Sequence, residues 1–387
     1  MILDQFFEQI TFQLSANLPF VAYRKPNTTT IKAMLQHNDA LYSLVDFSES
    51  GFVFAPFDSR EVTYIMPLEH SKIIDVEFVA DDLLEHDIHK KSVSANVVNV
   101  NSEVDKQSHI KRVVDCIETI KSGICSKIVL SRREQLEYLE NDPITIFKRL
   151  LHRYPTAFVY IWYHPKVGLW LGATPETLLS ITGNQLKTMA LAGTQSFEGS
   201  TEVVWEEKER EEQQIVTDFI VEGLKSAVDN SEGLHNTIKV FGPKTVQAGN
   251  LLHLLTEISM PLKPEPQLLK SILDAIHPTP AVCGFPKERA KTYIIDNEGY
   301  PREFYSGFMG ELNVKETISR NTNRRNVENN AYGSQKTVTH LYVNLRCMQI
   351  KDQELYIYVG GGITKDSNAE AEWSETVHKS IIIKSVL

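Results

Sequence analysis

The sequence predicts an α+β protein. Short apolar alternations typical of strands are mixed with helical segments, and the two kinds do not follow a regular βαβ order. The chain has 387 residues, 42% of them hydrophobic and 23% charged, so it can bury a large core without staples. These observations favour mixed strands and helices over a doubly wound parallel sheet.

The predicted strands are short apolar runs bounded by turn residues. They are residues 52–54, 62–66, 127–130, 158–162, 168–171, 178–181, 186–190 and 355–359. The turn at 182–184 (Thr-Gly-Asn) predicts a hairpin, and a proline turn joins 158–162 to 168–171. The predicted helices have apolar residues at helical spacing. They are residues 109–122, which Gly123 ends, 206–228, 267–276 and a C-terminal segment.

Two polar stretches separate these elements. Residues 80–108 are acidic and are expected to form a connector leading into the first long helix. Residues 316–337 are rich in asparagine and are expected to form a long mobile loop between two strands.

Charge and targeting signals exclude several classes of protein. The 40 Lys and Arg against 50 Asp and Glu give a net charge of −10, which does not indicate nucleic-acid binding. No signal peptide is evident, and no apolar stretch approaches the ~20 residues that span a bilayer. The four cysteines form no CxxC pair and are expected to be reduced. We therefore expect a cytoplasmic protein, in which binding of an anionic substrate needs local cations or a metal.

Two pairs of glutamates have helical spacing. Glu209 and Glu212 lie three residues apart, as do Glu372 and Glu375, with Lys379 one turn further on. If the two helices face one another, their carboxylates can hold a hard cation such as Mg²⁺. The alternative is two solvated helix faces, which the acidic run at 206–212 favours when taken alone.

Other candidate residues lie at strand ends. Gly360, Gly361 and Gly362 follow a predicted strand and precede a helix, where exposed N–H groups can bind an anion or simply form a flexible turn. Lys127 and Glu176 are ionisable groups in apolar settings, where burial can shift a pKa toward acid–base use. For any one of them taken alone, a side chain that points to solvent at a strand end is the favoured alternative.

Together these residues resemble the chorismate-binding family, which includes isochorismate, salicylate, anthranilate and aminodeoxychorismate synthases. The resemblance covers about residues 105–385 and rests on motifs in the family's order. They are SKIVLSR at 126–132, GATPE at 172–176, LAGT at 191–194, KEREE at 208–212, NLLHL at 250–254, HPTPAVCGFP at 277–286, YSGFMG at 305–310, RC at 346–347, GGGI at 360–363, EWSET at 372–376 and Lys379. The resemblance implies one large domain with two facing antiparallel sheets surrounded by helices. Residues 1–105 would be its variable N-terminal part and residues 106–387 its catalytic core.

The resemblance also implies roles for single residues. Lys127 would be the general base and Glu176 the general acid, while Glu209, Glu212, Glu372 and Glu375 would bind Mg²⁺. The implied substrate-binding residues are Ala192, Gly193, Thr194, His253, Ala281, Tyr305, Arg346, Gly360, Gly361, Gly362 and Lys379.

Three positions favour the isochorismate synthase branch. Lys127 resembles the base of water-adding members, whereas anthranilate synthases have Gln there. Ala192 replaces the nucleophilic lysine of aminodeoxychorismate synthases, and Ala281 resembles isochorismate synthases, where pyruvate-eliminating members tend to have Thr. Salicylate synthase, a subunit of an amine-adding synthase and a chorismate binder without turnover stay as alternatives. Gln213 departs from the family's usual His and is expected beside the metal site.

This interpretation implies chorismate as the substrate, Mg²⁺ as the cofactor and no obligate glutaminase subunit. We expect a monomer. Since no carrier domain is evident in the sequence, menaquinone biosynthesis is favoured over siderophore biosynthesis.

Overall fold

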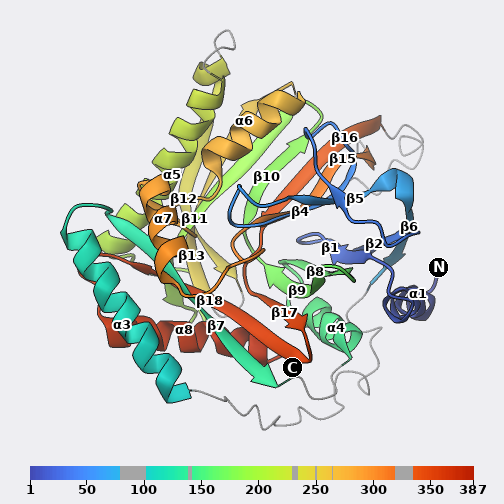
Figure 1. The fold of residues 1–387 in the computed structure, drawn as a ribbon. Coiled ribbons are helices and arrows are strands. Elements are labelled where there is room, and N and C mark those ends of the chain that lie inside the picture. Colours follow the sequence, from blue (N-terminus) through green and yellow to red (C-terminus); the bar gives the residue numbers. More distant parts are fainter. Residues whose placement is uncertain (79–101, 138–141, 229–233, 249–250, 264, 319–333) are drawn as a thin grey trace.

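The computed structural model describes residues 1–78, 102–137, 142–228, 234–248, 251–263, 265–318 and 334–387. Within these residues, the strands form two nine-stranded sheets in which every neighbouring pair is antiparallel (Figure 1). The predicted α+β class and the two antiparallel sheets are confirmed.

The first sheet contains the strand on which the candidate base lies. Its strands in spatial order are β14 (Gly284–Phe285), β7 (Lys127–Glu137), β18 (Glu354–Ile363), β17 (Cys347–Lys351), β9 (Gly168–Thr174), β8 (Phe158–His164), β1 (Phe20–Arg24), β2 (Thr30–Gln36) and β6 (Ser71–Glu77). β7 therefore lies near one edge, with only the two-residue strand β14 outside it.

The second sheet contains the hairpin expected around residues 182–184. Its strands in spatial order are β12 (Lys239–Ala248), β13 (Leu251–Pro261), β11 (Gln185–Ser196), β10 (Thr177–Thr182), β16 (Ser334–Val343), β15 (Phe308–Ile318), β4 (Gly51–Ala55), β5 (Tyr64–Pro67) and β3 (Tyr42–Ser43). The segment before residue 78 supplies strands to both sheets, so the N-terminal part is built into the same architecture.

Helices cover the outer faces of the two sheets. They are α1 (Leu3–Ser15), α3 (Ser102–Lys121), α4 (Pro143–Arg153), α5 (Glu207–Val228), α6 (Pro266–Ile276), α7 (Lys287–Asn297) and α8 (Ala369–Lys384), with 3₁₀ turns at Leu68–His70 and Leu234–Thr237. Helices α1 and α4 pack on the first sheet and α5 and α6 on the second, while α3 and α7 cover the β7 edge. Among the described helices, none is both long and apolar enough to cross a membrane.

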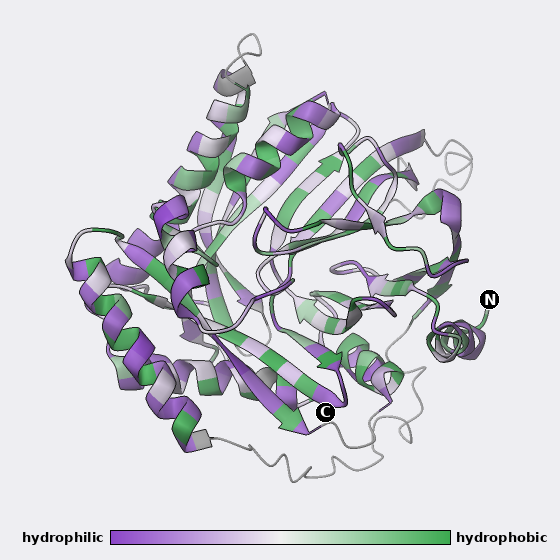
Figure 2. Cartoon of the chain, in the orientation of Figure 1, coloured by the Kyte–Doolittle hydropathy of each residue, from purple (hydrophilic) through white to green (hydrophobic). Residues whose placement is uncertain are grey.

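The space between the sheets is filled largely by aromatic side chains. Phe54 stacks on Phe304 at 4.2 Å between ring centroids, and Phe158 stacks on Tyr342 at 4.1 Å. Alternation along each strand separates this inner layer from the helix-covered outer layers, and Figure 2 shows the resulting banding of hydrophobic and hydrophilic residues. Beside this aromatic layer, a pocket lies near the ends of β7, β11, β13 and β18.

Several element boundaries differ from the expectations. The connector expected at 80–108 is helical from Ser102, and the loop expected at 316–337 is shorter, because Glu316 pairs with Lys336 and Ile318 with Ser334. Residues 80–101, 319–333 and Asn250 of the NLLHL motif lie outside the described residues.

The glycine run is also placed differently. Gly360, Gly361 and Gly362 belong to β18 and pair with Ser131, Leu130 and Val129 of β7, and α8 begins only at Ala369. The glycines therefore lie inside a strand and not next to a helix N-terminus as expected, and their part in substrate binding stays a prediction. The backbone of the three glycines continues the hydrogen-bonded ladder with β7 and makes no turn. Their lack of side chains leaves space beside the strand for other residues.

Candidate active site

A cavity of about 220 Å³ lies where helices α5 and α8 meet strands of both sheets. Fifteen of the residues expected from the sequence line it. They are Glu176, Ala192, Gly193, Thr194, Glu209, Glu212, His253, Ala281, Tyr305, Arg346, Gly360, Gly362, Glu372, Glu375 and Lys379. Lys127 and Gly361 lie immediately behind this lining. The tertiary structure therefore brings together segments separated by more than two hundred residues of sequence.

The two acidic helices face the cavity from one side. Glu209 and Glu212 reach it from α5, and Glu372 and Glu375 reach it from α8. Glu207 and Glu211 lie on the exposed face of α5, so the alternative of a solvated face holds for the rest of the acidic run. Side chains three residues apart share a helix face, and this periodicity aims the inner pair into the cavity.

Lysines hold two of these four carboxylates. Lys127 Nζ lies 2.5 Å from Glu212 Oε1, and Lys379 Nζ lies 2.7 Å from Glu375 Oε1. Burial alone would raise the pKa of Glu212, but the charge and hydrogen bond of Lys127 outweigh it, and the pKa is lowered. Lys379 also donates to the Gly360 carbonyl at 3.0 Å, which fixes α8 against β18.

The other two carboxylates carry buried oxygens without a hydrogen-bond partner. These atoms are Oε2 of Glu209 and Oε2 of Glu372. Burial raises the pKa of Glu372, and the neighbouring charge of Glu375 adds to the shift. An unsatisfied buried carboxylate oxygen is costly, and a hard cation would satisfy it. The donor set therefore fits Mg²⁺, although no three His, Cys, Asp or Glu side chains of the described residues converge closely enough to hold a metal.

Lys127 is the first residue of β7 and is 3% exposed. A proton acceptor needs a free lone pair, whereas a lysine that donates to a carboxylate at 2.5 Å presents a proton. The arrangement thus differs from the expected neutral base. To act as the base, Lys127 must first release one of its protons, and its bond to Glu212 must open.

Glu176 is a buried carboxyl on the other side of the cavity. It follows β9 and is 5% exposed. Burial raises its pKa to about 7, against the opposing charges of Lys127 and Arg346. A carboxyl with this pKa holds a proton in much of the population at neutral pH, as a general acid requires.

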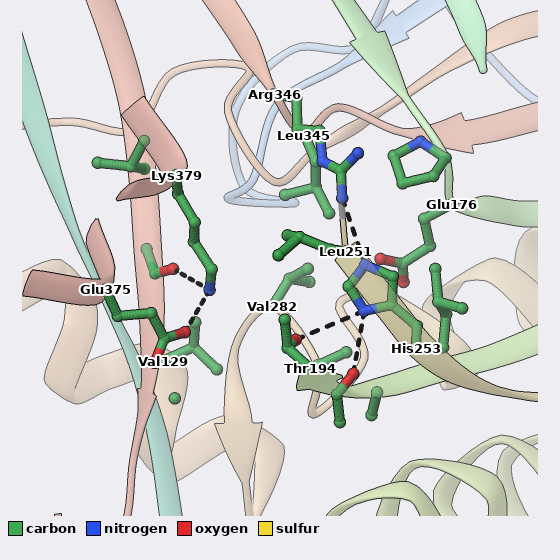
Figure 3. Close-up of a pocket in the computed structure, with 18 of the residues that line it drawn as sticks. Val129, Glu176, Thr194, Leu251, His253, Val282, Leu345, Arg346, Glu375 and Lys379 are labelled. Carbon is green, nitrogen blue, oxygen red and sulfur yellow. Dashed lines mark hydrogen bonds and ion pairs between the residues drawn. The ribbon is translucent and has the colours of Figure 1, made fainter. Parts of the chain in front are cut away.

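His253 and Arg346 form the wall beside Glu176 (Figure 3). His253 Nδ1 lies 3.0 Å from the Gly193 carbonyl oxygen, and its Nε2 lies 3.3 Å from Arg346 Nη2. Burial and the charge of Arg346 lower the pKa of His253 to about 4, so the ring is neutral at pH 7. A neutral ring with its proton on Nδ1 can donate to Gly193 and accept from Arg346, and it thereby holds a cation at the cavity.

The glycines of β18 make room for neighbouring side chains. A Cβ added at Gly362 would lie 2.9 Å from Lys127 Cε, and one added at Gly360 would lie 3.0 Å from the Tyr305 hydroxyl. A Cβ at Gly361 would lie 3.1 Å from Glu372 Oε2. Because these glycines have no side chains, Lys127 and helix α8 can approach strand β18 closely.

Gln213 is buried and does not belong to the lining of the cavity. Its Nε2 donates to the Ala190 carbonyl and to Thr256 Oγ1, both at 3.0 Å. Gln213 lies one turn after Glu209 on the same face of α5, so the expectation that it sits beside the metal site stays a prediction. Its side chain ties α5 to β11 and β13, and so supports Glu209 and Glu212.

Sequence reasoning missed the apolar wall and one lysine. Lys208 lines the cavity next to Glu209, and a charge run gave no reason to single it out. The missed apolar residues are Val129, Pro175, Leu191, Leu251, Val282, Leu345, Tyr358, Val359 and Ile383. Most of them sit within or beside the motifs, which is the signal that could have identified them.

Family models decide the assignment of the fold and pocket. Models described as chorismate-binding enzymes match residues 69–318 and 331–385, which together cover most of the chain. The chain belongs to the chorismate-binding enzyme family. The predicted resemblance is confirmed.

Known relatives fall in more than one branch of this family. The chain is 25% identical over 295 residues to anthranilate synthase component 1 of Lactococcus lactis, covering 73% of this chain and 58% of the relative. It is 25% identical over 295 residues to isochorismate synthase EntC of Escherichia coli, covering 74% and 68%. The chain thus spans little more than half the length of the first relative. Equal identity to both leaves the reaction to be argued from the pocket.

Solved structures share the fold across nearly the whole chain. Menaquinone-specific isochorismate synthase MenF of Escherichia coli matches with a TM-score of 0.71 and 18% identity, covering 95% of this chain and 88% of MenF. Isochorismate synthase DhbC of Bacillus anthracis matches with a TM-score of 0.69 and 21% identity, covering 97% and 98%. At these identities the likeness concerns the fold alone.

Proposed function

We propose that this chain is an isochorismate synthase that isomerises chorismate by adding water at C2 and expelling the C4 hydroxyl. The observation that supports it best is that a buried carboxyl of pKa about 7, Glu176, lines the cavity, while a buried lysine, Lys127, lies directly behind the lining. The charge of Lys127 acts on the pKa of Glu176, so the two groups are within electrostatic reach.

The proposed reaction uses these two residues as base and acid. Lys127 accepts a proton from the attacking water while the C2–O bond forms, the ring double bonds shift, and the C4–O bond breaks as Glu176 donates its proton. One water is consumed and one released, and solvent returns both residues to their starting states. Such acid and base roles are each worth about 10²–10⁴ in rate.

Cations around the cavity match the two carboxylates of chorismate. Arg346 and Lys379 lie on different walls of the cavity, as Figure 3 shows. Glu209, Glu212, Glu372 and Glu375 would hold Mg²⁺, which when bound supplies charge neutralisation to a substrate carboxylate. Glu212 would then serve as a metal ligand, and Lys127 would offer a lone pair to the water only after it has also given up one of its protons.

Two residues in the lining favour this reaction over its relatives. Ala192 lines the cavity where an amine-adding enzyme of the aminodeoxychorismate type would need a nucleophilic lysine. Ala281 offers no hydroxyl to a pyruvate-elimination step. The proposal concerns the conversion of chorismate only, so it holds whether the product feeds menaquinone, as first expected, or a catechol siderophore.

The test is direct. Purified protein is incubated with chorismate and MgCl₂, with an EDTA control, and the product is identified by HPLC. We expect isochorismate, formed reversibly, without pyruvate, ammonia or a second subunit. Salicylate with pyruvate would move the assignment to a salicylate synthase, and a requirement for ammonia would move it to the amine-adding branch.

A further inference from the structure

Two buried charged residues form an ion pair directly behind the pocket wall. Glu298 follows α7 and is 1% exposed, and Arg302 is 4% exposed. Arg302 Nε donates to Glu298 Oε2 at 2.7 Å, and Nη2 donates to Oε1. A buried ion pair stabilises a fold little more than apolar residues of similar volume would, so the pair's value lies in what it holds in place.

The pair completes the edge of β7. Strand β14 pairs with β7 through two residues only, which leaves later backbone groups of that edge without a strand. There the Val129 carbonyl accepts from Arg302 Nη2 at 2.7 Å, and the Ser131 amide donates to Glu298 Oε1 at 2.7 Å. Two side chains thus take the place of a neighbouring strand, four residues or fewer from Lys127.

Arg302 also binds two further segments of the wall. Its Nη1 donates to the Val282 carbonyl at 2.9 Å and to Ser306 Oγ at 3.3 Å, and its guanidinium lies 5.7 Å from the ring centroid of Tyr305. Val129, Val282 and Tyr305 all line the cavity. Each of the five N–H donors of Arg302 therefore has an acceptor, and three wall segments meet at one planar group.

We propose that Glu298 and Arg302 are positioning residues, which fix the placement of β7, the 279–283 turn and the 302–306 turn for catalysis. This inference rests on the proposed function. A misplacement of about 1 Å in reacting groups can cost about 10²-fold in rate, so the pair acts on Lys127 and the substrate without touching either. Lysine cannot replace Arg302, because it has three donors in a compact group instead of five in a plane.

The test compares Arg302→Lys with Arg24→Lys. Arg24 is a matched control, because it is 3% exposed, donates to the carbonyls of Leu151 and Tyr154 at 2.7 and 2.6 Å, and does not line the cavity. Because Arg302→Lys removes donors from a buried site and is expected to lose stability, the apolar double variant Glu298→Leu with Arg302→Met is measured beside it. Turnover of chorismate is measured well below the unfolding temperature of each variant, with kcat and KM separated.

We expect kcat to fall at least tenfold in folded Arg302→Lys and in the folded double variant, and to stay within twofold of wild type in Arg24→Lys. A folded double variant with wild-type kcat would overturn the proposal. Hydrogen exchange of peptides covering 127–131 and 279–284 gives a readout independent of the reaction. Faster exchange there in Arg302→Lys, without change in Arg24→Lys, supports positioning, and unchanged exchange overturns it. If wild type leaves chorismate unchanged, the proposed function fails, and the exchange measurement alone decides the positioning role.

Discussion

Two ion pairs at the pocket are built in opposite ways. In the Lys127–Glu212 pair, one oxygen meets one ammonium at 2.5 Å, and the Glu212 side chain is 31% exposed. In the Glu298–Arg302 pair, the side chains are 1% and 2% exposed, and every donor of the arginine is used. The first pair can exchange one partner for another cation, whereas the second cannot open without leaving a buried charge. The comparison teaches that a pocket can combine a fixed frame with an exchangeable charge, both anchored on β7.

The largest expected effect comes from removing the exchangeable lysine. Lys127→Ala should lower kcat by about 10²–10⁴, because the water then lacks its base, while the unfolding temperature changes little. Steady-state turnover of chorismate and thermal unfolding measure the two quantities. Lys244→Ala is the control, because Lys244 pairs with Glu257 at 2.5 Å on the exposed surface. Full activity of Lys127→Ala would remove this residue from the mechanism.

Breaking the fixed pair should act on stability instead. Arg302→Met alone should destabilise the fold by about 3–5 kcal/mol, because it leaves the Glu298 carboxylate buried without its partner. Replacing Glu298 with Leu in the same chain should restore most of the loss. Urea unfolding of the single and double variants checks this coupling. Equal stability of the two would show that the pair is not tightly coupled.

The raised pKa of the Glu176 carboxyl should make the stability of the fold depend on pH. The folded pKa of Glu176 is raised from 4.5 to about 7, so the folded state binds the extra proton between these values. The stabilisation of the fold by protonated Glu176 is therefore complete below about pH 4.5, and it is lost as the pH rises through about 7. Glu176→Gln should be more stable than wild type by about 1–3 kcal/mol at pH 8 and gain little at pH 4.5. Thermal unfolding across this range measures it, and a pH-independent difference would contradict the shift.

The same carboxyl should shape the rate profile. Since the reaction needs protonated Glu176, kcat/KM should fall as the pH rises above about 7. Glu176→Gln should lose most activity, and its remaining activity should not show this fall. Initial rates between pH 6 and 9 test this. A rate still rising through pH 8 would argue that Glu176 is not the proton donor.

The smallest expected effect concerns metal binding. If Lys127 and a cation compete for Glu212, Lys127→Met should bind Mn²⁺ about tenfold more tightly than wild type, through one removed positive charge near the site. Calorimetric titration in the absence of substrate measures this without relying on turnover. Lys244→Met should bind as wild type does, and Glu212→Gln should bind more weakly. Unchanged affinity in Lys127→Met would show that the pair does not compete with the metal.

Local patterns predicted much of the fold. The helix expected at 267–276 is α6 at Pro266–Ile276, and the helix expected at 206–228 is α5 at Glu207–Val228. Both have apolar residues at helical spacing, and Pro266 marks the start of α6. The hairpin at 178–190 follows from its turn residues. Strand lengths were less predictable: β7 extends to Glu137, because its polar residues find partners on β18.

The sequence by itself determined which residue types were available and their helical spacing, as with Glu209 and Glu212 or Glu372 and Glu375. Only the tertiary structure decided that Lys127 meets Glu212, that the glycines of β18 leave room for neighbouring side chains and that Gln213 bonds to β11 and β13. It also revealed Glu298 and Arg302, which no pattern singled out. The physical reason is that helix and strand periodicity depends on neighbours within a few residues, whereas charge pairing and clearance depend on contacts between segments far apart in the chain.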